Sequence, residues 1–257
     1  DNKLYTFPSP NDRVSAVKLV HIDGYYDKGG TKQNKAEAEA VVNEIIRRLS
    51  DEQLRTKSIG VVTFNIIQQN LIEDMLADGF SKKPELEKYD SESAEPVFVK
   101  NLENVQGDER DVILFSVGYG PDKDGKVSMN FGPLNRDGGW RRLNVAISRA
   151  RQEMIVYSTL TPEQIDLSRT RALGVEGLKG FLKFAGQNRN IVIPDGKVSV
   201  HNDNRVIEEI AKEIEKLGYK VNCNIGCSEY KIDIGIVDPE NPDSYLLGIL
   251  ADGENCK

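Results

Sequence analysis

The chain has 257 residues, of which 39% are hydrophobic and 29% charged, and its formal net charge is −7. This composition is ordinary for a globular protein and leaves room for one large domain or two small ones. Its apolar runs fall far short of the ~20 residues that span a bilayer, so we expect no membrane contact. The acidic balance argues weakly against a nucleic-acid-binding protein.

The first part of the chain alternates strands with helices. Runs of β-branched and apolar residues predict strands over 17–22, 58–64, 96–99 and 111–117. Residues 35–49 predict a helix with one apolar stripe, and Glu37, Glu39 and Glu44 are expected on its other faces.

A second helix follows the strand at 58–64. Asn65 begins it, Gly79 ends it, and the charged residues 81–95 are expected to form a loop. Residues 119–139 are rich in Gly, Asp, Asn and Pro, which predicts a long loop.

The next elements complete an α/β domain. A helix is predicted over 140–150, a strand over 154–157 and a last helix over 178–185. Strands that alternate with helices imply a parallel sheet covered on both faces.

A change of composition follows. The last residues predict a helix over 205–217 and strands over 219–223, 231–237 and 245–250, which make a small αβββ unit. We therefore expect a domain over 1–186, a linker over 187–204 with a short strand at 191–193, and a partial domain over 205–257. The partial domain buries too little to be complete by itself.

The three cysteines argue for a reducing compartment and against a zinc site. Cys223 and Cys227 have roughly zinc-like spacing, but the chain has only two histidines and one further cysteine, Cys256. A four-ligand zinc site is therefore not expected. Free thiols fit a reducing compartment, so we expect a cytoplasmic protein. Because the sequence begins with Asp1 and not with Met, we also expect it to be a piece of a longer protein.

Three motifs carry the chemistry. Ile59–Phe64 is followed by Gln68 and Gln69; Val105–Asp111 reads Val-Gln-Gly-Asp-Glu-Arg-Asp; and Leu143–Arg151 reads Leu-Asn-Val-Ala-Ile-Ser-Arg-Ala-Arg. In this order they resemble motifs IV, V and VI of superfamily 1 DNA helicases, and the early Asn34-x-x-Glu37-Ala38 is also similar to this family. The resemblance covers about residues 15–185. It implies a RecA-like P-loop NTPase fold and the second of the two motor lobes.

The resemblance implies that Arg149 is the arginine finger. An arginine presented from a second lobe stabilises charge on the transferring phosphoryl group, and its planar fork suits phosphate oxygens. Small neighbours, Ser148 and Ala150, leave room for close approach. The alternative is a surface arginine in a helix–strand loop, in a stretch (136–151) that holds five arginines.

The same resemblance assigns further ATP-site roles. Glu109 resembles the motif V acid that accepts a hydrogen bond from the nucleotide ribose, and Gln106 is suited to link nucleotide state to the nucleic-acid track. Gly107 allows the backbone to approach a ligand closely because it has no Cβ. Gln68 and Arg142 complete the predicted ATP-binding set. The alternative for Gln106–Glu109 is a polar turn before a strand.

Three polar residues are predicted to contact the nucleic acid. Thr63, Asn65 and Asn104 fall at strand ends that would face the track, and such motors contact phosphates and sugars through hydroxyl, amide and backbone groups. Each is equally plausible as a turn or N-cap residue. The expected partner is single-stranded DNA, with RNA possible.

The sequence does not contain a Gly-x-x-x-x-Gly-Lys-[Ser/Thr] phosphate loop. We therefore expect ATP and Mg²⁺ to be shared with a first helicase lobe of the same full-length chain, and this piece alone to hydrolyse essentially no ATP. A non-catalytic nucleic-acid-binding or regulatory module is the alternative function, and an RNA helicase lobe is another.

In the tail, the predicted helix is followed by Gly218–Val221, Tyr230–Ile234 and Leu246–Gly253. This pattern resembles a restriction-endonuclease-like domain of the very-short-patch-repair type. The resemblance implies a Mg²⁺ site built from Glu208, Asp233 and Asp252, with Glu209 an equal choice for the helix acid. Leu250 stands where the family commonly has a glutamate, which removes one oxygen ligand. A degenerate or truncated domain is therefore the alternative to an active nuclease.

Overall fold

The computed structural model describes residues 16–187, 204–225, 232–242 and 244–250. The chain divides into two compact units, the larger of which covers Ala16–Asn188. Within the described residues, none of the helices is both long and apolar enough to cross a membrane.

A five-stranded parallel sheet forms the centre of the larger unit. In sheet order its strands are β1 (Val17–His21), β5 (Ala150–Ser158), β4 (Arg110–Ser116), β2 (Ile59–Thr63) and β3 (Phe98–Asn101). Leu114 in β4 pairs with Val61 in β2 on one side and with Ile155 in β5 on the other. The predicted fold, a RecA-like α/β domain with a parallel sheet, is confirmed.

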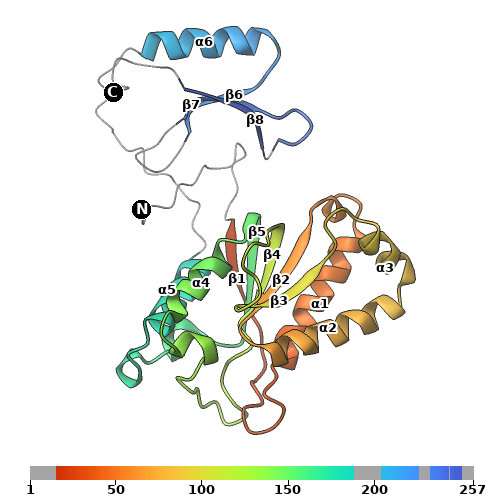
Figure 1. The fold of residues 1–257 in the computed structure, drawn as a ribbon, viewed down its shortest axis with the longest axis vertical. Helices are drawn as coiled ribbons and strands as arrows, with labels where there is room; N and C mark the ends of the chain where they lie inside the picture. The colour runs from red at the N-terminus through yellow and green to blue at the C-terminus, as the bar shows by residue number, and fades with distance from the viewer. Residues whose placement is uncertain (1–15, 188–203, 226–231, 243, 251–257) are drawn as a thin grey trace. The chain divides into compact units, whose positions relative to one another are not determined.

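Helices cover both faces of this sheet (Figure 1). One face carries α1 (Lys35–Ser50), α2 (Ile66–Ser81) and α3 (Pro84–Ser91), and the other carries α4 (Gly139–Ile147) and α5 (Leu173–Gly186). Short 3-10 turns complete the unit: η1 (Leu54–Thr56), η2 (Gly132–Asn135), η3 (Pro162–Gln164) and η4 (Leu167–Arg169).

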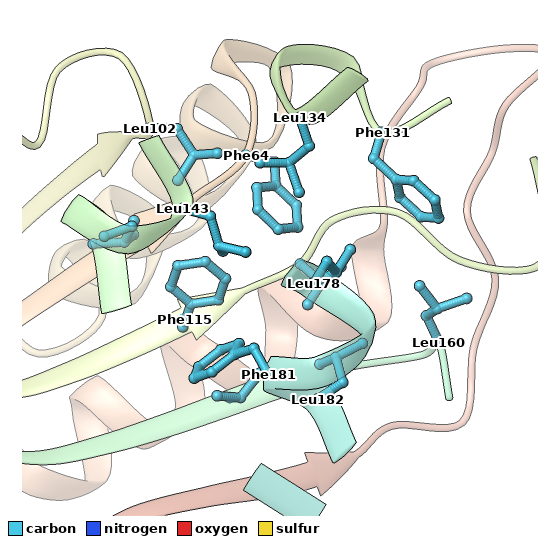
Figure 2. Packing of buried hydrophobic residues seen from close by; sticks show 14 of the residues in the cluster. Phe64, Leu102, Phe115, Phe131, Leu134, Leu143, Leu160, Leu178, Phe181 and Leu182 are labelled. Carbon is cyan, nitrogen blue, oxygen red and sulfur yellow. The ribbon is translucent and has the colours of Figure 1, made fainter. Parts of the chain in front are cut away.

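Alternate strand residues face the two helical layers, so the sheet separates two apolar cores. Ile113 and Phe115 pack with α4 and α5, whereas Val112 and Leu114 pack with α1 to α3. Figure 2 shows Phe64, Phe115, Leu143, Leu178 and Phe181 gathered in the first of these cores. Burial of both faces explains why the strands read as continuous apolar runs.

Some predicted boundaries were wrong on the α1–α3 face. Residues 81–95 are not a loop, because α3 begins at Pro84, a residue suited to the first helical turn, and buries Leu86 against the core. Gly79 does not end α2, which continues to Ser81. Gly79 faces α1: a Cβ built on it would lie 3.4 Å from Ile46, an ordinary van der Waals contact.

Glu37 was also misplaced by the sequence pattern. It is fully buried on the face of α1 that also buries Val41 and Ile45, four and eight residues on. Glu44 is half-buried, where it forms an ion pair with the buried Arg48 at 2.7 Å.

The boundary that matters most for function lies between α4 and β5. The helix ends at Ile147, its C-cap is Ser148, and β5 already begins at Ala150. Arg149 is therefore a junction residue and not part of the helix predicted over 140–150. The last helix also begins earlier than predicted, at Leu173.

The smaller unit contains α6 (Asn204–Lys216) and an antiparallel sheet of β6 (Val221–Ile225), β7 (Ile232–Val237) and β8 (Tyr245–Ile249), in that order. The predicted αβββ order is confirmed. The strand predicted at 191–193 and most of the predicted linker lie outside the described residues.

Candidate functional site

The parallel sheet has two chemically distinct ends. We call the end at which β2, β4 and β5 begin the amino edge, and the end at which they finish the carboxyl edge. The seven residues of β4, Arg110 to Ser116, separate these edges by ~20 Å at the usual strand rise.

The amino edge brings motifs V and VI together. The Arg110 amide donates a hydrogen bond to the Arg149 carbonyl oxygen at 3.2 Å. Arg151 Nη1 lies 3.9 Å from Glu109 Oε1. Glu109 and Arg149, 40 positions apart in the sequence, are therefore close neighbours at the start of β4 and β5.

Within the part of the chain that the structure describes, the guanidinium of Arg149 forms hydrogen bonds with neutral groups. Its Nε donates to the Val145 carbonyl oxygen at 2.8 Å, and its Nη2 donates to Ser148 Oγ at 3.1 Å. The Val145 carbonyl oxygen also accepts from Ser148 Oγ at 3.0 Å, so Arg149 adds a further donor at the end of α4, where positive charge is favourable. Among the described residues, no carboxylate forms an ion pair with Arg149.

The neighbouring Arg151 is neutralised instead. It pairs with Glu95, lies 3.2 Å from Asp111 Oδ1, and donates to Ser58 Oγ at 2.9 Å. The Arg151 guanidinium also lowers the pKa of Glu95 through their hydrogen bond. Of these two arginines, Arg149 is thus the one whose charge is free for an anion.

Arg142, which lies within α4 and precedes Arg149 by seven positions, has an unsatisfied donor. Its Nη1 is buried and has no hydrogen-bond partner among the described residues. A buried donor without a partner is costly, and a phosphate oxygen would satisfy it.

Gly107 is required for a reason other than the predicted one. A Cβ built on it would meet nothing within 4 Å, so close approach of another group does not demand a glycine here. Its φ of +92° does, because residues with a side chain rarely adopt that conformation. Gln106, beside it, is exposed on the segment that leads into β4.

The carboxyl edge is organised by one buried carboxylate. Glu37 Oε2 accepts hydrogen bonds from Ser116 Oγ at 2.9 Å and the Gly118 amide at 2.7 Å. Its Oε1 accepts from the Thr159 amide at 2.8 Å, from Thr159 Oγ1 at 3.3 Å and from Asn34 Nδ2 at 3.0 Å. Glu37 therefore joins the start of α1 to the ends of β4 and β5.

No lysine or arginine in the described part of the chain pairs with Glu37. Burial raises the pKa of Glu37 to about 7, although the hydrogen bonds from Gly118 and Thr159 act in the opposite direction. We name this group of side chains and amides the Glu37 network: Asn34, Glu37, Gln68, Ser116, Gly118 and Thr159.

Gln68 belongs to this network and not to the amino edge. It is fully buried, its Oε1 accepts from the Asn34 amide at 2.9 Å, and its Nε2 donates to the Asn34 carbonyl oxygen at 2.9 Å. A further contact from Nε2 reaches Ser116 Oγ at 3.3 Å. The structure therefore does not bring Gln68 together with Arg149, which lies at the other end of β4.

The predicted nucleic-acid contacts all lie near the carboxyl edge, but they differ in access. Thr63 is fully buried, and its Oγ1 has no hydrogen-bond partner among the described residues. Asn65 is the N-cap of α2, where its side chain accepts from the Gln68 amide at 2.9 Å. Asn104 is exposed, and its amide donates to the Asn101 carbonyl oxygen at 3.0 Å.

A family model described as an AAA domain matches residues 3–160. The chain belongs to the AAA domain family. The match spans the parallel sheet and includes Glu109 and Arg149, and it ends before the small unit begins.

Relatives of this AAA domain are named as helicases. The chain is 37% identical over 196 residues to an uncharacterized ATP-dependent helicase of Mycoplasma genitalium, a match of 72% of this chain and 16% of the relative. It is 25% identical over 198 residues to the DNA polymerase alpha-associated DNA helicase A of Saccharomyces cerevisiae, covering 73% of this chain and 25% of that protein. The chain thus spans a quarter or less of the length of these relatives.

Among the solved structures that are similar is the C-terminal domain of a possible DNA helicase from Lactobacillus plantarun WCFS1. The likeness covers 62% of this chain and 83% of that chain at 13% identity, with a TM-score of 0.36. A TM-score this low supports no inference about the AAA domain. The relatives and the family match together support a helicase-like domain.

The nuclease-like residues lie outside the AAA domain match. Glu208 is exposed on α6, Asp233 is half-buried on β7, and Asp252 lies outside the described residues. Among the residues that the structure describes, acidic, histidine and cysteine side chains form no cluster of three suited to a metal ion. Cys223 is exposed on β6, whereas Cys227 and Cys256 also lie outside the described part.

Sequence reasoning missed Glu37 as the organiser of the AAA domain's carboxyl edge. A signal was present, because Glu37, Val41 and Ile45 repeat at four-residue spacing and must share one helix face. An acid on an apolar stripe, three residues after the N-cap Asn34, indicates a buried carboxylate that needs several donors.

Proposed function

We propose that this chain carries the second RecA-like lobe of a superfamily 1 ATP-dependent DNA helicase. It supplies the arginine finger, Arg149, to an ATP site that it shares with a first lobe. The observation that carries the proposal is the meeting of Glu109 and Arg149 at the amino edge, with the guanidinium of Arg149 unpaired by any described carboxylate.

The residues of the amino edge fit a nucleotide in charge and in hydrogen-bonding capacity. Arg149 and the unsatisfied Nη1 of Arg142 offer donors to phosphate oxygens. Glu109 is exposed and accepts a hydrogen bond from a ribose hydroxyl. Mg²⁺ would neutralise phosphate charge, and it would be held by the first lobe, which would also supply the phosphate loop that this sequence does not contain.

The catalytic contribution of Arg149 is electrostatic. As the bond to the leaving group loosens, negative charge spreads over the transferring phosphoryl group, and a planar guanidinium with two parallel donors stabilises it. To reach that group, Arg149 exchanges its bonds to Val145 and Ser148 for bonds to phosphate oxygens. Both are neutral partners, so the exchange leaves no ion pair broken.

The segment over 102–109 provides a route between the two edges. It leaves β3 at the carboxyl edge, close to Asn104, and reaches β4 at the amino edge, beside Glu109. Gln106 lies on this segment. A strand of DNA at the carboxyl edge, contacted by Asn104 and Asn65, therefore affects the position of the ATP-site residues through a short, continuous piece of backbone.

The proposal is tested by ATP turnover of the helicase that contains both lobes. Arg149→Ala should lower kcat by on the order of 10³–10⁵, and Arg149→Lys should recover little, because an ammonium lacks the planar fork. Arg47→Ala is the matched control: this exposed arginine lies on α1, on the opposite face of the sheet, and its loss should leave kcat unchanged. An unchanged kcat in Arg149→Ala would refute the finger.

The 257-residue chain alone should show essentially no ATP turnover, because the phosphate loop is not in its sequence. Nucleic-acid-stimulated hydrolysis by the purified chain would contradict the assignment to a second lobe. Unwinding assays on matched DNA and RNA duplexes decide between a DNA and an RNA motor. A cytoplasmic location stays a prediction.

The small unit is the remaining part of the proposal. Its α6–β6–β7–β8 order suits an endonuclease-like domain, with Glu208 and Asp233 as candidate oxygen ligands for Mg²⁺. Because Leu250 replaces an expected glutamate, we expect metal binding to be weak. Mg²⁺-dependent DNA cleavage that Asp233→Asn abolishes would show an active nuclease, and cleavage that Asp233→Asn leaves intact would exclude this site.

A further inference from the structure

An exposed aromatic ring stands among arginines at the start of α4. Trp140 is 45% exposed, although it is the only tryptophan of the chain and tryptophan is usually well buried. The Arg141 guanidinium lies over its ring, 5.2 Å from the centroid. The first turn of this helix contains no acidic residue. We call Arg136, Trp140 and Arg141 the tryptophan patch.

The backbone that precedes Trp140 is closely packed. A Cβ at Gly139 would lie 2.5 Å from the Leu134 carbonyl oxygen and 2.7 Å from that of Pro133, so α4 begins in direct contact with η2. The Gly139 amide donates to the Arg136 carbonyl oxygen at 3.0 Å. The backbone at the start of α4, from which Trp140 projects, is therefore held against η2.

The patch adjoins the carboxyl edge. Arg136 Nη1 lies 3.6 Å from Glu103 Oε1, and Glu103 is next to Asn104. The Glu103 amide in turn donates to Asn101 Oδ1 at 2.9 Å, at the end of β3. The tryptophan patch and the exposed Asn104 thus lie along one stretch of surface.

We propose that Trp140 is a stacking platform for a base of single-stranded nucleic acid, with Arg136 and Arg141 contacting the flanking phosphates. An exposed indole with arginines beside it matches how proteins bind single strands without sequence preference: aromatic faces stack the bases, and basic groups follow the backbone. Arg136 would exchange its contact with Glu103, at 3.6 Å, for a contact with a phosphate, and Arg141 stands beside the ring. The inference rests on the proposed strand-binding function and extends it to a site that the helicase motifs do not contain.

The single tryptophan makes the test specific, because all indole fluorescence of the chain comes from Trp140. Unlabelled single-stranded DNA and RNA oligonucleotides of mixed sequence are titrated into the purified chain while emission and acrylamide quenching are recorded. Stacking should quench the emission and protect the ring from acrylamide. The DNA and RNA arms show which strand binds more tightly.

Variants separate stacking from simple apolar contact. With a dye-labelled oligonucleotide and anisotropy as the readout, Trp140→Leu should weaken binding by on the order of 10-fold, whereas Trp140→Phe should retain most of the affinity. Phe184→Leu, the same kind of change at an exposed ring on α5, is the matched control and should bind like the wild type. Arg136→Ala and Arg141→Ala should each reduce the slope of log affinity against log salt by about 1.

Two results would overturn the stacking platform. One is oligonucleotide binding with unchanged Trp140 emission and with wild-type affinity in Trp140→Leu, which would leave the proposed helicase lobe intact. The other is no binding of either strand at low salt, which would show that Trp140 is not a stacking platform. Neither result depends on ATP turnover, so the Arg149 test judges the proposed motor function separately.

Discussion

The two edges of the parallel sheet hold their polar groups in opposite ways. At the amino edge, arginines and acids lie in or near solvent, and Arg149 remains unpaired by any described carboxylate. At the carboxyl edge a single carboxylate, Glu37, is buried among amides and hydroxyls. The two edges therefore differ in function. Exposed charged groups at the amino edge can bind a ligand, whereas the buried carboxylate at the carboxyl edge stabilises the ends of the strands.

The largest effect on stability should come from the Glu37 network. Glu37→Ala removes the acceptor of the Ser116 hydroxyl and of the Gly118 and Thr159 amides, all of which are buried. Each buried donor left unsatisfied costs ~1–3 kcal/mol, so we expect a loss of at least about 3 kcal/mol in the free energy of unfolding, measured with denaturant.

Glu39→Ala is the control for that change. Glu39 lies two residues further along α1 and is exposed, so its loss should alter stability by no more than about 0.5 kcal/mol. Equally small losses of unfolding free energy in Glu37→Ala and Glu39→Ala would contradict the comparison between the two edges. The buried carboxylate would then not stabilise the strand ends.

The pH dependence of stability should show the same carboxylate. Burial raises the pKa of Glu37 from an ordinary 4.5 to about 7, so the folded state binds its proton more tightly than the unfolded state. The contribution of this group to stability is therefore complete below pH 4.5 and is lost as pH rises through about 7, by up to ~3 kcal/mol.

Denaturant unfolding at pH 5, 6, 7 and 8 measures this slope, with Glu37→Gln as the comparison. The wild type should lose stability with rising pH relative to Glu37→Gln, which cannot ionise at this position. Parallel pH profiles for the two proteins would show that Glu37 has no raised pKa.

The smallest effect should come from the charged amino edge. Arg151 is about one-third exposed, and its pairs with Glu95 and Asp111 are partly screened by water. Arg151→Ala should cost about 1 kcal/mol or less, and the cost should shrink as salt is added. The loss of unfolding free energy in Glu37→Ala should not change with salt. A loss that did change with salt would contradict the distinction between a buried and an exposed edge.

Most of the fold could be predicted from the sequence because periodicity is a local property. The strands at β2 and β4 are continuous apolar runs, and the stripe on α1 is regular. Residues 84–91 were missed because α3 is short and charged and buries only Leu86, so its pattern resembles that of a loop.

Residues of the candidate site could be predicted from the sequence only where they belong to a recognisable motif. Glu109 and Arg149 follow from motifs V and VI, but their meeting at one edge depends on strand register, which a single sequence does not state. Gln68 was grouped with the ATP-binding residues because motif IV contains it. Its place in the Glu37 network follows from contacts with Asn34 and Ser116, 34 and 48 positions away.

The most direct test of the central claim compares ground-state and transition-state binding in the helicase that contains both lobes. An arginine finger acts on charge that develops during phosphoryl transfer, so it should matter little for ADP and greatly for ADP with aluminium fluoride, which mimics the transferring group. We predict that Arg149→Ala leaves the Kd for ADP within a few-fold of the wild-type value and weakens binding of the mimic by on the order of 10³ or more. Equal weakening of both ligands, or of neither, would contradict the assignment of Arg149 as the finger.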